Sequence, residues 1–278
     1  MMVDTANAIQ SHILTKNENM KKENGYKSVP LSFNRQAVIA SASVSGKKNA
    51  IHFFTEVDIT EPRRLIREHF EKTAEKLSLT AYIVKCLSEV IHDYPEFNSF
   101  IRGRKHIFLD DITISVLVER DVNREKVPEP VGISHTQNKT YKEISNEIRD
   151  AMKNQTEQLG SLSGQLWIKF IPDFLLKIFI SLADKNIYMA KKYGKVAVTS
   201  IGMFAKEAVW IIPHGTATVL LSVGGISRKV VETENQIQSR EHICLTLSFD
   251  HNIIDGGPAA RFTGQLIETI KSGKSFIL

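Results

Sequence analysis

The chain has 278 residues, of which 42% are hydrophobic and 24% are charged. This balance is typical of a soluble globular protein and excludes a chain that is mostly disordered. The net charge of +5 comes from basic residues spread along the sequence, whereas nucleic-acid-binding proteins usually gather theirs into a stripe or an arm. We therefore expect no nucleic-acid partner.

The two cysteines, Cys86 and Cys244, each lie in an apolar segment. One possible pair does not make a disulfide framework, and there is no CxxC or Cys/His cluster of the kind that binds zinc. We expect buried thiols in a reducing compartment and no metal. The N-terminal stretch lacks the continuous apolar core of a signal peptide, so a cytoplasmic location is expected.

Residues 1–31 are polar, rich in Asn and Lys, and without a sustained period, which predicts a flexible polar N-terminal tail. Residues 32–278 alternate between strand and helix patterns without a clean break. This predicts a single α/β domain, in which helices pack on a mixed β-sheet. Its first two elements are β-rich runs at 36–43 and 50–59.

Two helices are expected next. Thr60 is a suitable N-cap for a helix that reaches about residue 76, with Pro62 in its first turn. Thr80 is expected to cap the second helix, and Pro95 stops it. The later expected elements are a strand at 112–119, a helix at 142–158, strands at 195–200, 217–223 and 243–249, and a helix at 258–270.

The segment 165–184 (QLWIKFIPDFLLKIFISLAD) is unusually apolar. Lys169, Asp173 and Lys177 interrupt it, so it falls short of the roughly 20 nearly uncharged residues that a membrane span needs. Pro172 indicates the first turn of a helix. We expect a helix buried against the core or a neighbouring subunit. A membrane-surface helix, or a lid over a substrate entrance, is the alternative.

A chemical motif stands at 247–258 (LSFDHNIIDGGP), where an expected strand ends and an expected helix begins. His251 supplies a base, and Asp255 a carboxylate that can brace the loop. The glycines that follow can take a positive φ. Loops at strand ends are favoured positions for sites, because the rigid sheet positions them. The sequence lacks GxGxxG after a strand, GxxxxGK[ST], HExxH and GxSxG, which argues against the enzyme classes that use them.

The segment 249–262 (FDHNIIDGGPAARF) closely resembles the motif that ends the catalytic domain of 2-oxo-acid dehydrogenase acyltransferases, DHRxxDG followed by a helix with AARF. Chloramphenicol acetyltransferases share the HxxxDG element. The segment 196–204 (VAVTSIGMF) is similar to the family's FTISNLGMFG strand and turn. EVDIT at 56–60 and YPEFN at 94–98 also fit. The resemblance extends over nearly the whole chain from about residue 32, and implies the chloramphenicol-acetyltransferase-like fold of CoA-dependent acyltransferases.

The resemblance also implies roles for individual residues. His251 is the expected general base, and Thr199 stands in place of the family's oxyanion-stabilising serine. Asp255 is expected to hold the loop through an ion pair, with Arg35 as its partner. Four further residues are expected along the substrate or CoA channel: Ser200, Gly202, Asn252 and His214. His52 and His214 are expected to be structural or to line the channel rather than to act in catalysis.

By the same resemblance, coenzyme A (as acyl-CoA) is a substrate, and three chains form a homotrimer with active sites shared between subunits. The tail before residue 32 cannot contain a folded lipoyl domain. We therefore expect a free-standing catalytic domain that uses a lipoyl carrier only in trans, if at all.

The sequence departs from the family pattern in places that bear on the acyl acceptor. Asn252 replaces an arginine, Ala205 replaces a glycine, and 212–215 (IPHG) replaces a proline-proline turn. Three functions stay open. They are acyl transfer between CoA and a dihydrolipoyl-type thiol, O- or N-acylation of a small molecule, and a non-catalytic assembly role. The retained His251 and Asp255 argue against the third.

Overall fold

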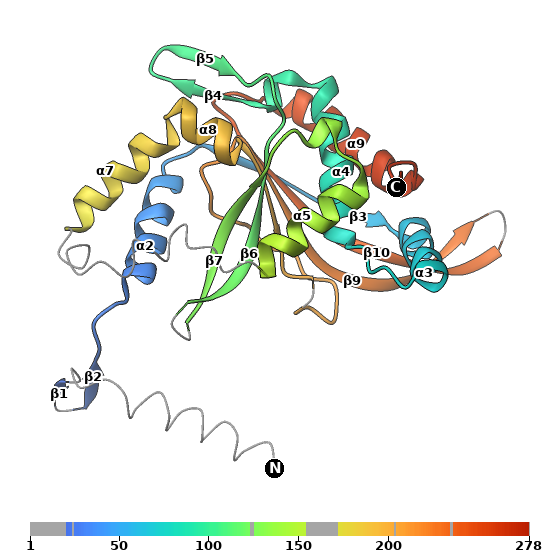
Figure 1. Ribbon diagram of the computed structural model, residues 1–278, viewed down its shortest axis with the longest axis horizontal. Helices are drawn as coiled ribbons and strands as arrows, with labels where there is room; N and C mark the ends of the chain where they lie inside the picture. The colour runs from blue at the N-terminus through green and yellow to red at the C-terminus, as the bar shows by residue number, and fades with distance from the viewer. Residues whose placement is uncertain are drawn as a thin grey trace.

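The computed structural model describes residues 21–23, 25–122, 125–153, 172–202, 204–233 and 236–277. Its centre is a six-stranded mixed sheet (Figure 1). The strand order is β3 (Ala50–Asp58), β10 (Gln236–Asp250), β9 (Val219–Thr233), β8 (Val196–Ser200), β6 (Ile114–Val122) and β7 (Glu125–Ile133). The β9–β8 and β8–β6 pairs are parallel, and the other pairs are antiparallel. The expected α/β fold with a mixed sheet is confirmed.

One face of this sheet carries the main hydrophobic core. α4 (Leu79–Asp93), α5 (Tyr141–Lys153) and α9 (Gly256–Ser272) lie over it (Figure 1). α4 is apolar on nearly every side, and ten of its residues are buried, because it lies between the sheet and its two neighbours. α3 (Thr60–Thr73) packs against α9 and α4.

The opposite face is covered differently. α8 (Ile187–Tyr193) lies against β7 so closely that a Cβ on Gly132 would lie 2.2 Å from the carbonyl oxygen of Lys192. α2 (Phe33–Ser45) and α7 (Asp173–Asp184) pack against each other beside the sheet (Figure 1). The smaller elements are β1 (Lys21–Glu23), β2 (Tyr26–Ser28), η1 (Pro95–Phe97), β4 (Ser99–Arg102), β5 (Lys105–Phe108) and η2 (Thr136–Asn138).

The expected strand at 36–43 is wrong: these residues belong to the helix α2. Ser32 caps this helix by accepting a hydrogen bond from Arg35 N. Small residues such as Ala37 and Ala40 favour a helix there, and its packing partner α7 is far along the chain. Arg35 therefore lies on a helix and not on a strand.

Other differences are smaller. α4 is capped by Ser78 rather than Thr80, and Thr60 is the first residue of α3 rather than its cap. No strand was expected at β7, which contains Pro128 and Pro130. The structure places them in an edge strand, where a missing N–H is tolerated. β9 and β10 extend well beyond the predicted runs.

The helix expected after Pro172 is confirmed as α7, and residues 165–171 of that segment lie outside the described residues. Within one chain most of its apolar side chains are exposed. Leu176 faces the protein, whereas Phe179 and Leu182 are 65% and 66% exposed. In the described parts of the chain, no helix has both the length and the apolar character needed to cross a membrane. Residues 1–20 of the predicted tail also lie outside the described residues.

Candidate active site

His251 lies in the turn between β10 and α9, at the end of the sheet. Its backbone N–H donates to Asn49 O at 2.7 Å, which ties the turn to the start of β3. Asp250, the last residue of β10, accepts from Ile253 N and Ile254 N and so closes the turn. The imidazole is half-exposed, and it can therefore meet a substrate or another chain.

The tautomer of His251 follows from its hydrogen bond. Nδ1 lies 3.0 Å from Ile254 O. A carbonyl oxygen can only accept, so Nδ1 carries the proton and donates it. In the neutral ring the lone pair is then on Nε2, the nitrogen that a general base uses. Asp255 Oδ1, at 3.6 Å from Nδ1, stabilises the same orientation.

An aromatic cluster holds the elements on each side of this turn. Phe262 of α9 stacks on Phe97 with ring centroids 4.2 Å apart. Phe249 of β10 packs edge-on against both rings. All three side chains are fully buried, which explains the phenylalanine of the AARF element as a packing residue that fixes α9 against β10.

A cluster of buried and partly buried charges joins the other segments at this end of the sheet. Lys48 Nζ lies 3.2 Å from Asp250 Oδ2 and 4.0 Å from Asp184 Oδ2. Lys195 Nζ lies 2.7 Å from Asp184 Oδ1 and 4.8 Å from the centre of the Phe100 ring. The cluster connects the end of α7 to the starts of β3 and β8 and to the last residue of β10.

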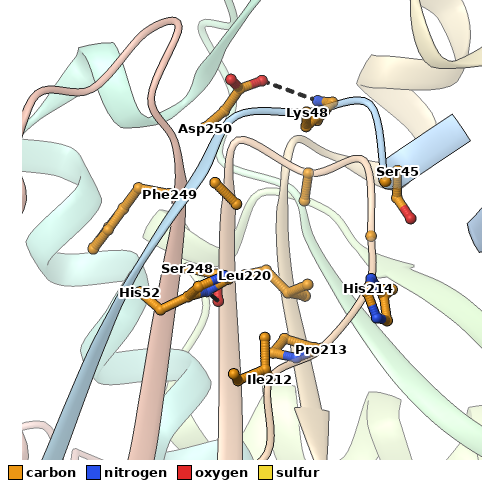
Figure 2. A pocket seen from close by; sticks show the side chains of 14 residues that line it. Ser45, Lys48, His52, Ile212, Pro213, His214, Leu220, Ser248, Phe249 and Asp250 are labelled. Atoms are coloured by element: carbon orange, nitrogen blue, oxygen red, sulfur yellow. Dashed lines mark hydrogen bonds and ion pairs between the residues drawn. The ribbon is translucent and has the colours of Figure 1, made fainter.

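A cavity of about 220 Å³ opens next to these charges (Figure 2). Lys48 and Asp250 lie at one end, and His52 and His214 line its walls. His52 Nδ1 lies 2.7 Å from Ser248 Oγ. Because this hydrogen bond fixes the ring, His52 has a defined structural role, and both histidines line a cavity.

Thr199 lies near the end of β8, and one chain does not bring it to His251. In strand register, Thr199 is beside Ser222, which is beside Thr246. Asp250, the residue before His251, is four positions further along β10 and two strands away from β8. With about 3.4 Å per residue and about 4.8 Å between strands, the Thr199 and Asp250 backbones lie roughly 17 Å apart.

The expected partners Arg35 and Asp255 are placed apart. Arg35 is exposed on the first turn of α2, and Asp255 precedes α9. Among the described residues, the basic group beside Asp255 is His251, which forms an ion pair with it only when the imidazole is protonated. Asp255 is 85% exposed in one chain, so its carboxylate is open to a group from another chain.

The other expected channel residues divide into two groups. Asn252 is next to His251 and bridges Asn49 and Asp250, at 3.0 Å and 2.7 Å. Ser200 and Gly202 lie at the far end of β8, beside Thr199 and next to β9. A Cβ on Gly202 would lie 2.8 Å from Gly224 O. These two glycines therefore allow the turn after β8 to lie close to β9.

Sequence reasoning missed the charge cluster. Lys48 is far along the chain from Asp184 and Lys195, which lie 11 residues apart on either side of α8. Only the aspartate of the FDHN motif, Asp250, belonged to a recognised pattern. It also missed the buried hydroxyls of Ser222 and Thr246, since a serine or threonine in a strand carries no sign of its strand neighbours.

Comparison with known proteins supports the family. The family model of the 2-oxoacid dehydrogenases acyltransferase (catalytic domain) matches residues 23–163 and 189–278. The chain is 29% identical over 256 residues to the lipoamide acyltransferase component of the branched-chain alpha-keto acid dehydrogenase complex of Bacillus subtilis, covering 89% of this chain and 53% of the relative. It is 26% identical over 242 residues to the dihydrolipoyllysine-residue succinyltransferase component of the 2-oxoglutarate dehydrogenase complex of Staphylococcus aureus, covering 84% and 50%. The chain thus spans about half the length of the curated relatives it matches.

Solved structures share the fold. The Azotobacter vinelandii dihydrolipoamide acetyltransferase, studied for the role of a serine, a histidine and an asparagine in its catalytic mechanism, matches with a TM-score of 0.69 at 21% identity, covering 91% of this chain and 94% of that one. A probable dihydrolipoamide acetyltransferase from Listeria monocytogenes matches with a TM-score of 0.68 at 20% identity, covering 90% and 96%. The family match covers most of the chain, and it includes both the β8 turn and the His251 turn. The chain belongs to the 2-oxoacid dehydrogenase acyltransferase family, to its catalytic domain.

Proposed function

We propose that this protein is a CoA-dependent acyltransferase that moves an acyl group between CoA and a dihydrolipoyl-type thiol. The observation that carries the proposal is the hydrogen bond from His251 Nδ1 to Ile254 O, which leaves the lone pair on Nε2 in a half-exposed ring. The relatives named for lipoamide and dihydrolipoyllysine support a thiol acceptor. The protein works in the cytoplasm.

The reaction is a proton transfer followed by acyl exchange. His251 Nε2 takes the S–H proton of the acceptor, and the sulfur attacks the carbonyl carbon of the acyl-CoA thioester. The tetrahedral oxyanion accepts a hydrogen bond from the Thr199 hydroxyl. When the C–S bond to CoA breaks, the imidazolium returns its proton to the CoA sulfur. Asp255 keeps the ring in position throughout.

The distance between Thr199 and His251 in one chain supports shared sites. A separation of roughly 17 Å at the backbone exceeds what two such side chains can span around a thioester carbonyl. A homotrimer in which each His251 faces the Thr199 of the next chain completes three sites. Residues on two subunits then form each one.

The test is acyl transfer by purified protein. Acetyl-CoA and branched or succinyl thioesters are incubated with dihydrolipoamide and with a panel of small alcohols and amines. The products are separated by chromatography and identified by mass. We expect transfer to the thiol, and we expect His251→Ala to lower kcat by about 10²–10⁴-fold.

His92→Ala is the matched control, because His92 is an exposed histidine in the last turn of α4. It should keep the wild-type rate. A His251→Ala protein that retains full activity would show that the proposed base is wrong. Transfer only to alcohols or amines would replace the thiol acceptor with a small-molecule acceptor.

A further inference from the structure

Four of the five buried side-chain atoms that lack a hydrogen-bond partner in the described residues lie on one pair of strands. They form two cross-strand pairs between β9 and β10, Ser222 with Thr246 and Ser227 with His242. Ser222 is also in register with Thr199 on β8. A row of three hydroxyl-bearing residues therefore crosses three neighbouring strands, and it begins at the proposed oxyanion donor.

All three hydroxyl-bearing side chains lie on the same face of the sheet. Successive residues of a strand alternate between its faces. Leu221 and Leu245, which precede Ser222 and Thr246, belong to the main core, as does Val198 before Thr199. Thr199, Ser222 and Thr246 therefore point to the opposite face.

The burial of Ser222 and Thr246 implies that their hydroxyls have a function that requires a hydrogen-bond partner. Ser222 is 1% exposed and Thr246 is 0% exposed. Buried hydroxyls are almost always hydrogen-bonded, and an alanine and a valine would fill the same space with no unsatisfied atom. Where a sequence breaks such a rule next to a reacting group, function is the expected reason.

The strand spacing fits one shared acceptor. Neighbouring strands are about 4.8 Å apart, so a single oxygen atom placed between the Thr199 and Ser222 hydroxyls can lie within hydrogen-bonding distance of both. We propose that Ser222 donates a second hydrogen bond to the oxyanion that Thr199 binds. Thr246, one strand further, is a positioning residue that orients the Ser222 hydroxyl from the neighbouring strand. This inference rests on the proposed acyltransferase function.

The segment after β8, which includes Val209 and Trp210, lies against β9 next to this row of hydroxyls. Gly225 N donates to Val209 O at 3.0 Å, and a Cβ on Gly224 would lie 2.0 Å from that same oxygen. Trp210 Nε1 donates to Thr55 O at 3.1 Å, which fixes the segment across β3 as well. Because the segment keeps water off this part of the sheet, a hydrogen bond from Ser222 acts in a low-dielectric setting, where it is stronger.

The experiment compares four variants with the wild type in the thiol-acceptor assay, with kcat and KM measured separately and Tm measured alongside. Removal of one oxyanion donor lowers kcat by about 10²-fold, so we expect that loss in Ser222→Ala with KM nearly unchanged. Its Tm should stay the same or rise, because an unsatisfied atom is removed. Thr246→Val should lower kcat by about 3–10-fold, and Thr246→Ser, which keeps the hydroxyl, should restore it.

Ser88→Ala is the matched control, since the Ser88 hydroxyl is also fully buried but bonds Thr136 Oγ1 at 2.7 Å on the helical side of the core. It should lower Tm and leave kcat unchanged. An active wild type with an unchanged kcat in Ser222→Ala overturns this inference alone. A loss of activity in Ser222→Ala that is explained by a loss of folded protein overturns this inference as well. A wild type inactive with every acyl-CoA and thiol overturns the proposed function and this inference together.

Discussion

Lys195 Nζ lies 2.7 Å from Asp184 Oδ1, and the two side chains are only 6% and 12% exposed. Burial lowers the pKa of the Lys195 amine, and the Asp184 carboxylate opposes that shift. The pair joins the first residue before β8 to the last residue of α7. It thus connects the strand that carries Thr199 to a helix that lies in the gap left by the family match, between residues 163 and 189.

Removal of one partner of this pair should be costly. Lys195→Met leaves the Asp184 carboxylate buried and short of one partner, which destabilises a fold by about 3–5 kcal/mol. The double variant Lys195→Met with Asp184→Leu removes both charges and should recover most of that loss. Urea unfolding curves of the three proteins measure the change in midpoint at constant slope. Equal stability of wild type and Lys195→Met would show that the pair contributes nothing.

Shared sites predict complementation between inactive variants. His251→Ala and Thr199→Val should each be nearly inactive alone. When the two chains are unfolded, mixed in equal amounts and refolded, about a quarter of the subunit contacts combine an intact His251 with an intact Thr199. Activity should therefore return to about a quarter of the wild-type level. A mixture as inactive as its parts would mean that His251 and Thr199 do not act together across a subunit contact.

Substitution by alanine should lower the stability of the protein at Gly225 and raise it at Gly264. At Gly225 a Cβ would lie 1.8 Å from Glu207 O, so Gly225→Ala forces the segment after β8 away from the sheet and should cost about 1–3 kcal/mol. It should also lower kcat, because Gly225 is close to the hydroxyl row. Gly264 lies inside α9 with open space around its Cβ position, so Gly264→Ala should add about 0.5–1 kcal/mol.

Thermal unfolding of the two alanine variants checks this contrast. The Tm should fall for Gly225→Ala and rise for Gly264→Ala. A Gly225→Ala protein with wild-type stability and kcat would show that the segment can move without consequence.

The thiol of Cys86 should be unreactive in the folded protein. Burial raises the pKa of Cys86 to about 12. The raised pKa also makes the stability depend on pH, because the thiol ionises at a lower pH in the unfolded protein than in the folded one. The contribution of Cys86 is fully present below about pH 9 and is lost as the pH rises toward about 12.

Titration with an aromatic disulfide reagent at pH 8 measures this reactivity. Cys244→Ser leaves Cys86 as the remaining thiol. We expect no fast reaction in buffer and one equivalent in denaturant. Rapid modification of the native variant would contradict the burial of Cys86.

Local patterns were enough to predict a large part of the fold. The apolar period of α4, the alternation in β6 and the strand-turn-helix around His251 can all be read within short windows, because burial on one face imposes a period on neighbouring residues. The HxxxDG and TSIGMF segments likewise placed His251 and Thr199 at strand ends. β7 was not predicted: it contains two prolines, which an edge strand tolerates, and nothing nearby in the sequence marks a strand as an edge.

The tertiary structure determined which distant segments of the chain lie next to each other. The sequence of α2 is compatible with a strand. In the structure it is a helix, and it packs against α7, which lies more than a hundred residues further along the chain. Strand register placed Ser222 beside Thr199 and Thr246 beside Ser222, and the same register separated Thr199 from His251. Register depends on pairing between distant segments and on the extra residue at Gly224–Gly225 in β9, so no window of the sequence contains it.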